Sequence, residues 1–363
     1  MNRVLGSVRH TGAREGCHRG WGGSAIALRW GTILTRIVRT WAQGAPAEPG
    51  HGSADAFLPD LVVAPVRPVA NADAQGAALP PHESLCEAPV ISIVLGSMNR
   101  FDLLRKAVES ARTELRDVDG EIIVVDGGST DGSAEWLLRQ HDVITIIQKN
   151  RFEAGGRALR KRSWGGFMNM GFRAAVGRHV LMISDDCLLA PGAVTAALVR
   201  IEEAEAAGLK VGACAFYFRN WPEEDRYYVQ RTIGGNLMVN HGLYSKEALE
   251  AVGYADERSY VFYKADTDLS LRIWRAGFAI IDSPGSICEH YIGVAEALRA
   301  SNNAVMDYDR EQMRRLWPDL VSKAAVSKMG KVFLDRAPGP QAEAAWGELR
   351  RREQVGLEVA PSK

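Results

Sequence analysis

The chain has 363 residues, a hydrophobic content of 46% and a formal net charge of +0, with 44 basic and 44 acidic side chains. Its length accommodates one large domain or two modest ones, and the lack of a basic excess argues against general nucleic-acid binding. No apolar run reaches the roughly 18 residues of a membrane span. No C-x-x-C pair occurs, which fits a reducing compartment better than a disulfide framework or a zinc cage; the cysteines are Cys17, Cys86, Cys187, Cys214 and Cys288.

Residues 1–88 are predicted to be an N-terminal extension. The stretch 45–89 is rich in Ala, Pro and Gly and holds no helical or strand period, so it is predicted to be linker or disorder. Residues 25–41 place apolar side chains on one helical face and Arg29, Arg36 and Arg39 on another. Such a helix can lie on an anionic membrane surface. An unstructured extension is the alternative interpretation.

From Pro89 onward, short apolar runs alternate with helical patterns. The predicted strands are 90–95, 121–125, 143–148 and 179–184. A helix is predicted between each consecutive pair of these strands. This alternation predicts an α/β fold with a doubly wound, mostly parallel sheet. Further on, helices are expected at 191–207 and 265–277, and strands at 211–218 and 278–282. Residues 89–320 form the predicted domain, and 321–363 a peripheral C-terminal tail.

Three carboxylate clusters follow predicted strands or open a predicted helix. Asp126 precedes two glycines, Asp185 and Asp186 end a buried strand, and Asp266 and Asp268 begin a helix. Ligands of open α/β sheets bind at the carboxyl ends of the strands. Adjacent carboxylates there favour a hard divalent cation, Mg²⁺ or Mn²⁺, that also holds a diphosphate. Each cluster alone has a simpler interpretation, as a turn, a solvated loop or a helix first turn.

The order of these motifs, with "PVISIVLGSMNR" upstream, resembles the family 2 glycosyltransferases of GT-A fold. The resemblance covers Pro89 to Val294 and implies a Rossmann-like nucleotide-binding half joined to an acceptor-side half. It implies that Asp266 is the catalytic base with Asp268 as helper, and that Asp186 and His290 bind the metal. It also implies donor-binding and acceptor-binding residues. The donor set is Asn99, Arg100, Asp126, Gly127, Asn169 and Asp185, and the acceptor set is Gly235 and Asn236.

The family pattern differs from this chain at two places. Gly96, Ser97 and Met98 stand where the family usually has Pro-Thr-Tyr, and Ala265 replaces a glutamate before the base. A basic segment, Arg157 to Arg162, is expected to close over a sugar diphosphate or else to be a solvated loop.

The resemblance implies an inverting, metal-dependent glycosyltransferase in polysaccharide or glycan biosynthesis. The donor would be a nucleotide sugar, most often UDP-linked, and the acceptor a glycan, a lipid-linked sugar or a protein. The expected location is cytoplasmic, with peripheral contact at the inner membrane face through the N-terminal segment. Two alternatives remain open, a sugar nucleotidyltransferase and a non-catalytic nucleotide- or glycan-binding relative. A dinucleotide oxidoreductase is disfavoured because no G-x-G-x-x-G follows a strand.

Overall fold

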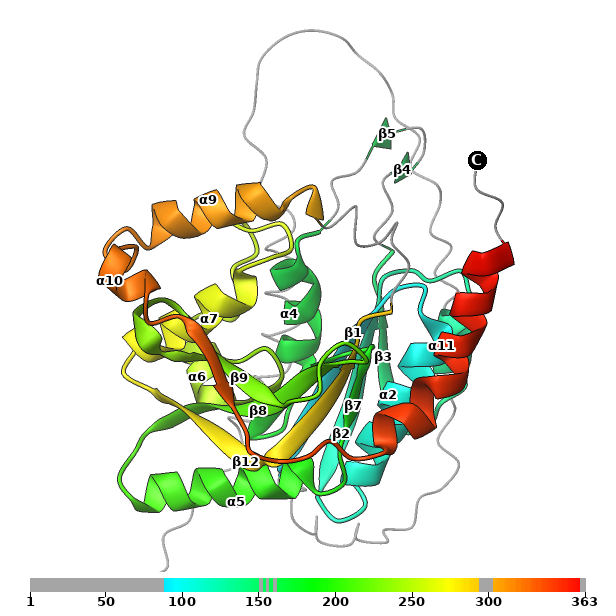
Figure 1. The fold of residues 1–363 in the computed structure, drawn as a ribbon, viewed down its shortest axis with the longest axis horizontal. Coiled ribbons are helices and arrows are strands. Elements are labelled where there is room, and N and C mark those ends of the chain that lie inside the picture. Colours follow the sequence, from blue (N-terminus) through cyan, green and yellow to red (C-terminus); the bar gives the residue numbers. More distant parts are fainter. Residues whose placement is uncertain (1–87, 150–152, 155–156, 159–161, 294–302, 360–363) are drawn as a thin grey trace, which may run out of the picture. The chain divides into compact units, whose positions relative to one another are not determined.

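A computed structural model describes residues 88–149, 153–154, 157–158, 162–293 and 303–359 (Figure 1). They fall within one compact unit, Leu79–Lys363. The predicted amphipathic helix at 25–41 and residues 159–161 of the basic segment 157–162 lie outside the described residues. None of the described helices is long and apolar enough to cross a membrane.

The first half of the sheet is parallel, as the sequence predicts. Strand β1 (Ile91–Ser97) lies between β2 (Gly120–Asp126) and β6 (His179–Ser184), and β3 (Val143–Ile147) pairs with β2 at the edge. All four strands run parallel, so their carboxyl ends meet at one edge of the sheet. The register pairs Ser97 with Asp126 and Gly96 with Ser184, which brings the loops after β1, β2 and β6 together.

The other half of the sheet is mixed. Strand β11 (Gly242–Ser245) runs antiparallel between β6 and β8 (Val211–Trp221), and β9 (Tyr228–Arg231) and β10 (Leu237–Met238) continue the order. Strand β12 (Ala279–Tyr291) pairs in parallel with β8 and antiparallel with the short β7 (Cys187–Leu189). The sequence analysis expected a strand at 278–282 only; the structure continues it to Tyr291 through a register shift between Ser283 and Ile287.

Helices cover both faces of the sheet and enclose two hydrophobic clusters. Helices α2 (Phe101–Glu114) and α5 (Ala193–Ala206) bury Leu104 and Ile201 against one face. On the other face, α4 (Trp164–Ala174), α6 (Lys246–Ala251) and α7 (Ala265–Arg275) bury Phe172, Leu249 and Ile273 (Figure 1). The remaining small elements are α3 (Ser133–Leu137), β4 (Glu153–Ala154), β5 (Arg157–Ala158) and the 3₁₀ turn η1 (Ile233–Gly235).

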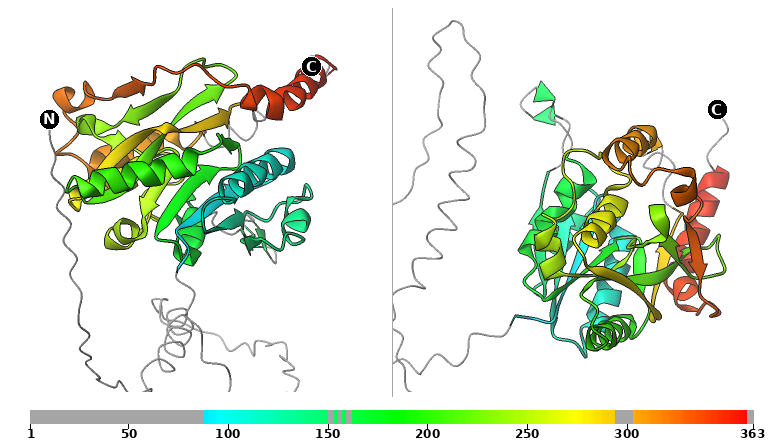
Figure 2. Two further views of the ribbon diagram at one scale, coloured as in Figure 1. Left: turned by 90° about the horizontal axis from the view of Figure 1, so that it is seen from below. Right: turned by 90° about the vertical axis from the view of Figure 1, so that its left-hand side faces the viewer.

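The C-terminal segment is built into the domain, in contrast to the peripheral tail expected at 321–363. After α9 (Met306–Leu316) and α10 (Lys323–Val326), strand β13 (Gly330–Phe333) pairs with β9. Helix α11 (Gln341–Val359) buries Trp346, whose ring centroid lies 5.3 Å from that of Tyr291 and 5.9 Å from that of Trp221. Figure 2 shows α11, in red, beside α2, in cyan. The charged surface pattern of α11 gave no sign of this single buried aromatic.

Candidate active site

The turn after β2 is organised by Asp126. Its buried carboxylate accepts hydrogen bonds from the backbone N–H groups of Gly128 and Ser129 and from the Ser129 hydroxyl, at 2.8, 2.8 and 2.6 Å. Asn99 faces this turn with a left-handed φ of 54°, which asparagine tolerates better than most residues. Its backbone N–H donates to the Ser129 Oγ, and its Oδ1 accepts from Thr130 N. The predicted donor residues Asn99 and Asp126 therefore form one corner.

Gly127 sits where that corner is narrowest. A Cβ atom at this position would lie 3.0 Å from the Cβ of Met98, and the Gly127 N–H donates to the Ser97 carbonyl at 2.8 Å. The close approach of the two loops thus explains why the position after Asp126 is glycine.

Asp185 and Asp186 share one cation, the guanidinium of Arg100. The Nη1 atom of Arg100 lies 2.8 Å from Asp185 Oδ1 and 2.7 Å from Asp186 Oδ2. Both carboxylates are buried, at 3% and 6% exposure. Although burial opposes it, the two carboxylates raise the pKa of Arg100. Burial raises the pKa of Asp185 despite its contact with Arg100. Arg100 thus offsets the repulsion between two adjacent buried carboxylates.

The free side of Asp186 faces His290. Asp186 Oδ1 lies 3.6 Å from His290 Nε2, while His290 Nδ1 lies 2.7 Å from Asn220 Oδ1. Asn220 Nδ2 donates to the Tyr228 hydroxyl at 3.0 Å, which directs Oδ1 toward the imidazole. Nδ1 is therefore the donor to Asn220, and Nε2 turns its lone pair toward a carboxylate oxygen. Two acceptors in this arrangement favour a proton or a cation between them.

These residues fit a hard divalent cation. Asp185 Oδ2 is buried and has no hydrogen-bond partner among the described residues, so it remains able to accept one more interaction. Asp186 and His290 offer an oxygen and a nitrogen that, together with the sulfur of Cys187, lie within 4.8 Å of one another. Carboxylate oxygens are the ligands that Mg²⁺ and Mn²⁺ prefer, and imidazole nitrogen is compatible with Mn²⁺.

Asp266 is the second residue of α7, which begins at Ala265 after Lys264, a residue with a left-handed φ of 71°. Its Oδ1 accepts from Thr267 N at 2.7 Å, and Asn240 Nδ2 lies 3.4 Å from its Oδ2. Burial raises the pKa of Asp266, and the Thr267 backbone N–H only partly offsets this effect. A carboxylate with a raised pKa and one lightly engaged oxygen can accept a proton.

Asp268 points to the opposite side of α7. Its carboxylate accepts from Arg272 Nε at 2.7 Å, Trp317 Nε1 at 2.9 Å and the Tyr260 hydroxyl at 3.3 Å. These contacts tie α7 to the segment after α9 and use both oxygens of the carboxylate. None of these contacts involves Asp266, and the role of Asp268 as helper of the base remains a prediction.

Asn169 on α4 holds a loop of the second half. Its Nδ2 donates to the Ala255 carbonyl at 2.9 Å and to Glu257 Oε1 at 2.8 Å, and its Oδ1 accepts from Ala255 N at 3.0 Å. The side chain is fully buried, and its amide is engaged on both ends. Its predicted role in donor binding remains a prediction, and the contacts present are with residues 255–257.

The predicted acceptor residues Gly235 and Asn236 lie in a separate turn. Gly235 has a φ of 85°, and a Cβ atom there would lie 3.3 Å from the Cβ of Lys328, just after α10. The Asn236 carbonyl accepts from Thr232 N at 2.7 Å. This turn is shaped by backbone contacts, and acceptor binding by it remains a prediction.

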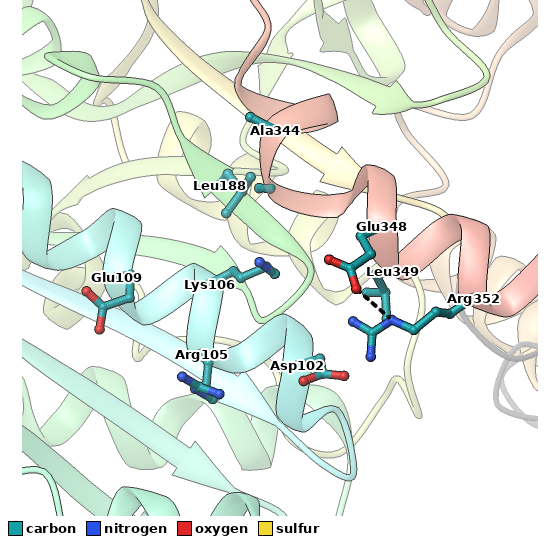
Figure 3. Close-up of a pocket in the computed structure, with 10 residues that line it drawn as sticks. Asp102, Arg105, Lys106, Glu109, Leu188, Ala344, Glu348, Leu349 and Arg352 are labelled. Carbon is teal, nitrogen blue, oxygen red and sulfur yellow. Dashed lines mark ion pairs between the residues drawn. The ribbon is translucent and has the colours of Figure 1, made fainter.

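A cavity of about 540 Å³ lies away from these residues, between α2 and α11 (Figure 3). Its lining mixes both charge signs, and the labelled side chains include Asp102, Arg105, Lys106, Glu348 and Arg352. Glu348 and Arg352 form an ion pair of 3.8 Å across one turn of α11. The lining contains none of the predicted site residues.

Comparison with known proteins bears on the same segment. Residues 92–253 match the family model described as Glycosyl transferase family 2. These residues run from β1 through α6 and contain Asp126, Asp185 and Asp186. Residues 92–253 belong to glycosyltransferase family 2. This match confirms the family resemblance and the enzyme class predicted from the sequence, and the mixed α/β sheet agrees with the predicted fold class.

Several solved structures are similar at low identity. The mannosyltransferase PcManGT from Pyrobaculum calidifontis, in complex with GDP-Man and Mn²⁺, is 16% identical, with 77% of each chain covered and a TM-score of 0.46. TarS 1–349 of S. aureus is 13% identical, with 55% of this chain and 60% of that chain covered and a TM-score of 0.42. The chain thus spans less than two thirds of TarS 1–349. No match was found among curated proteins. These structural similarities are too weak to indicate the substrate of this chain.

Two residues of the glycosyltransferase site were missed by sequence reasoning. Asn220 orients His290, and Asn240 approaches Asp266. Both are single asparagines in β8 or just before β11, and nothing in their local sequence distinguishes them from other polar residues. Only the pairing of β8 with β12, which sets Asn220 opposite His290, reveals the first.

Proposed function

We propose that the domain transfers a sugar from a nucleoside-diphosphate donor to an acceptor hydroxyl with inversion at the anomeric carbon. The observation that carries this proposal is the meeting of Asp126, Asp185 and Asp186 with Arg100 at the carboxyl edge of the parallel strands. Nucleotides bind at this edge in open α/β sheets. The membership of residues 92–253 in family 2 supports the same reaction class.

The donor is held by the loops after β1, β2 and β6. Hydrogen bonds of Asp126 and Asn99 hold the loops after β1 and β2 together. The backbone of these two loops would contact the nucleoside. Arg100 immediately precedes α2, and its guanidinium can bind a diphosphate oxygen. A UDP sugar is the expected donor, in keeping with the family resemblance.

Asp186 and His290 would hold the divalent cation. Bound there, Mg²⁺ or Mn²⁺ would offset the charge of the diphosphate and of the departing nucleoside diphosphate. Asn220 keeps the His290 lone pair directed at this place, because its amide oxygen accepts from the opposite ring nitrogen.

Asp266 acts as the general base. It removes the proton from an acceptor hydroxyl as that oxygen attacks the anomeric carbon from the face opposite the leaving group. The carbon–oxygen bond to the diphosphate breaks in the same displacement, so the configuration inverts once. The raised pKa of Asp266 makes its carboxylate a better proton acceptor than an ordinary aspartate, and Asn240 orients one oxygen.

Replacement of the base tests this proposal. Asp266→Asn keeps the size of the side chain but removes its basicity, so turnover of donor and acceptor should fall by about 10²-fold or more. Binding of nucleoside diphosphate should survive, because no donor-binding residue is changed. Asp319→Asn, at an exposed ion pair with Arg275, is the matched control and should retain full turnover. Wild-type turnover in Asp266→Asn would remove the base assignment, and release of pyrophosphate from a nucleoside triphosphate and a sugar phosphate would favour a nucleotidyltransferase.

A further inference from the structure

A second group of metal-ligand atoms lies behind the donor site. Cys187, His241 and Cys288 each direct one ligand atom to a common point, and these atoms all lie within 4.8 Å of one another. The residues are buried, with exposures of 0%, 6% and 0%. The proposed transfer reaction uses none of them. Two of the three buried free cysteines in the described residues therefore meet one histidine at a single place.

Long-range pairing creates this group, which is why the spacing of the cysteines did not predict it. Strand β7 pairs antiparallel with β12, where Cys187 stands opposite His290 and Cys288 opposite Leu189. Cys187 and Cys288 are thus diagonal neighbours on the two strands. His241 comes from the segment before β11, which is fixed by a hydrogen bond of 2.9 Å from Phe216 N to the His241 carbonyl.

The distances suit tetrahedral coordination. Cys187 Sγ lies 3.6 Å from His241 Nδ1 and 3.7 Å from its Nε2. Bond lengths of about 2.3 Å for Zn–S and about 2.05 Å for Zn–N, at tetrahedral angles, require an S···N separation of about 3.6 Å.

The environment also supplies a fourth ligand position. Asp186 Oδ1 lies 3.8 Å from Cys187 Sγ, and the His241 and His290 ring centroids are 5.5 Å apart. The cluster therefore borders Asp186 and His290 on one side, and Phe218 lies edge-on to His241 with ring centroids 5.1 Å apart.

We propose that Cys187, His241 and Cys288 form a binding site for a thiophilic divalent cation of the Zn²⁺ class, with Asp186 or a water as fourth ligand. On binding, both thiols release their protons to solvent, and the two thiolates balance the charge of the ion. Thiolate and imidazole ligands select zinc over magnesium or manganese, so this cation differs in kind from the one proposed for sugar transfer.

Cobalt serves as the probe, because Co²⁺ bound by thiolates in a tetrahedral site absorbs in the near ultraviolet through charge transfer. The full chain is titrated with Co²⁺ after Cys17 and Cys86, which lie outside the described residues, are replaced by serine. One equivalent of Co²⁺ should produce the charge-transfer band, and one equivalent of Zn²⁺ should abolish it. Cys187→Ser and Cys288→Ser should each lose most of the band. Cys214→Ser, at a buried free cysteine on β8, is the matched control and should keep it.

A second measurement needs no core substitution. Zn²⁺ should protect Cys187 and Cys288, and not Cys214, from alkylation in the wild-type protein under mild denaturant, as read by mass spectrometry. A cobalt spectrum without charge transfer, or equal protection of all three cysteines, would overturn the proposal. Neither readout uses a nucleotide sugar, so failure here leaves the proposed transfer reaction intact, and failure of transfer leaves the zinc site intact.

Discussion

At the scale of single residues, Arg100 is the feature on which the donor site most depends. Its guanidinium contacts both Asp185 and Asp186, two buried carboxylates that repel each other without it. A divalent cation at Asp186 would supply the same compensation. The arginine and the metal therefore neutralise overlapping charge, and the stability of this edge of the sheet should depend on whichever is present.

Arg100→Gln tests this interdependence. Removal of one partner from a buried ion pair costs about 3–5 kcal/mol, and because Arg100 keeps 22% of its side chain exposed we expect a loss of about 2–4 kcal/mol in the free energy of unfolding. Mn²⁺ should increase the free energy of unfolding more in the variant than in the wild type. Urea denaturation with and without Mn²⁺ measures this effect. Arg105→Gln, on the exposed side of α2, is the control; an equal loss there would contradict the role of Arg100.

Asp266 gives a prediction for the pH dependence of the reaction. Burial favours its protonated form and raises its pKa above the ordinary value of 3.8. The base must be ionised to accept a proton, so kcat/KM should increase as pH rises through this raised pKa. A pH–rate profile should therefore show an acid limb above the range of an ordinary aspartate. A rate that is independent of pH down to pH 4 would contradict the base assignment.

At the scale of elements, α9 holds the loop that precedes Asp266 in place. The buried carboxylate of Asp309 accepts from the backbone N–H groups of Val261, Phe262 and Tyr263, at 2.7, 2.9 and 2.7 Å. That loop leads through Lys264 into Asp266 at the start of α7. Helix α9 therefore fixes the segment that leads into Asp266, although it lies outside the segment that matches the family model.

Asp309→Asn should weaken these contacts. The new NH₂ group cannot accept the two N–H bonds made to Oδ2, and unsatisfied buried donors cost about 1–3 kcal/mol each. We expect a loss of about 2–5 kcal/mol in unfolding free energy and a lower kcat, with the affinity for nucleoside diphosphate unchanged. Calorimetry and steady-state kinetics measure the two effects. Asp307→Asn, with a side chain 96% exposed on the same helix, should change neither; a fall in nucleotide affinity alone would count against this role of Asp309.

The elements that the sequence predicts well are those with a strong local pattern. The structure has β1, β2, β6 and α7 at the positions that the sequence predicts. Each of these elements has a continuous hydrophobic period and a glycine or polar residue at its boundary. The C-terminal half of β12 and the burial of α11 were not predictable. Residues 286–291 become strand only because β8 and β7 flank them, and Trp346 is the one aromatic residue on a largely polar helix.

At the scale of the whole molecule, the sheet joins a parallel half to a mixed half through β6 and β11. The sequence predicts the parallel half and the position of its aspartates, since Asp126 ends one apolar strand and Asp185 directly follows another. The sequence could not predict what the second half contributes. Asn220, His241 and Cys288 reach the same edge only through β8, β11 and β12, whose pairing joins residues far apart in the chain.

The proposed transfer reaction requires a divalent cation at Asp186 that binds the donor diphosphate. The most direct test is calorimetric titration of UDP and of GDP into the wild type and into Asp186→Asn, with and without Mn²⁺. We expect Mn²⁺ to strengthen nucleoside diphosphate binding by about 10-fold or more in the wild type, a gain of about 1.4 kcal/mol, and to have little effect in the variant. Equal affinities with and without Mn²⁺ in the wild type, or an undiminished Mn²⁺ effect in Asp186→Asn, would contradict it.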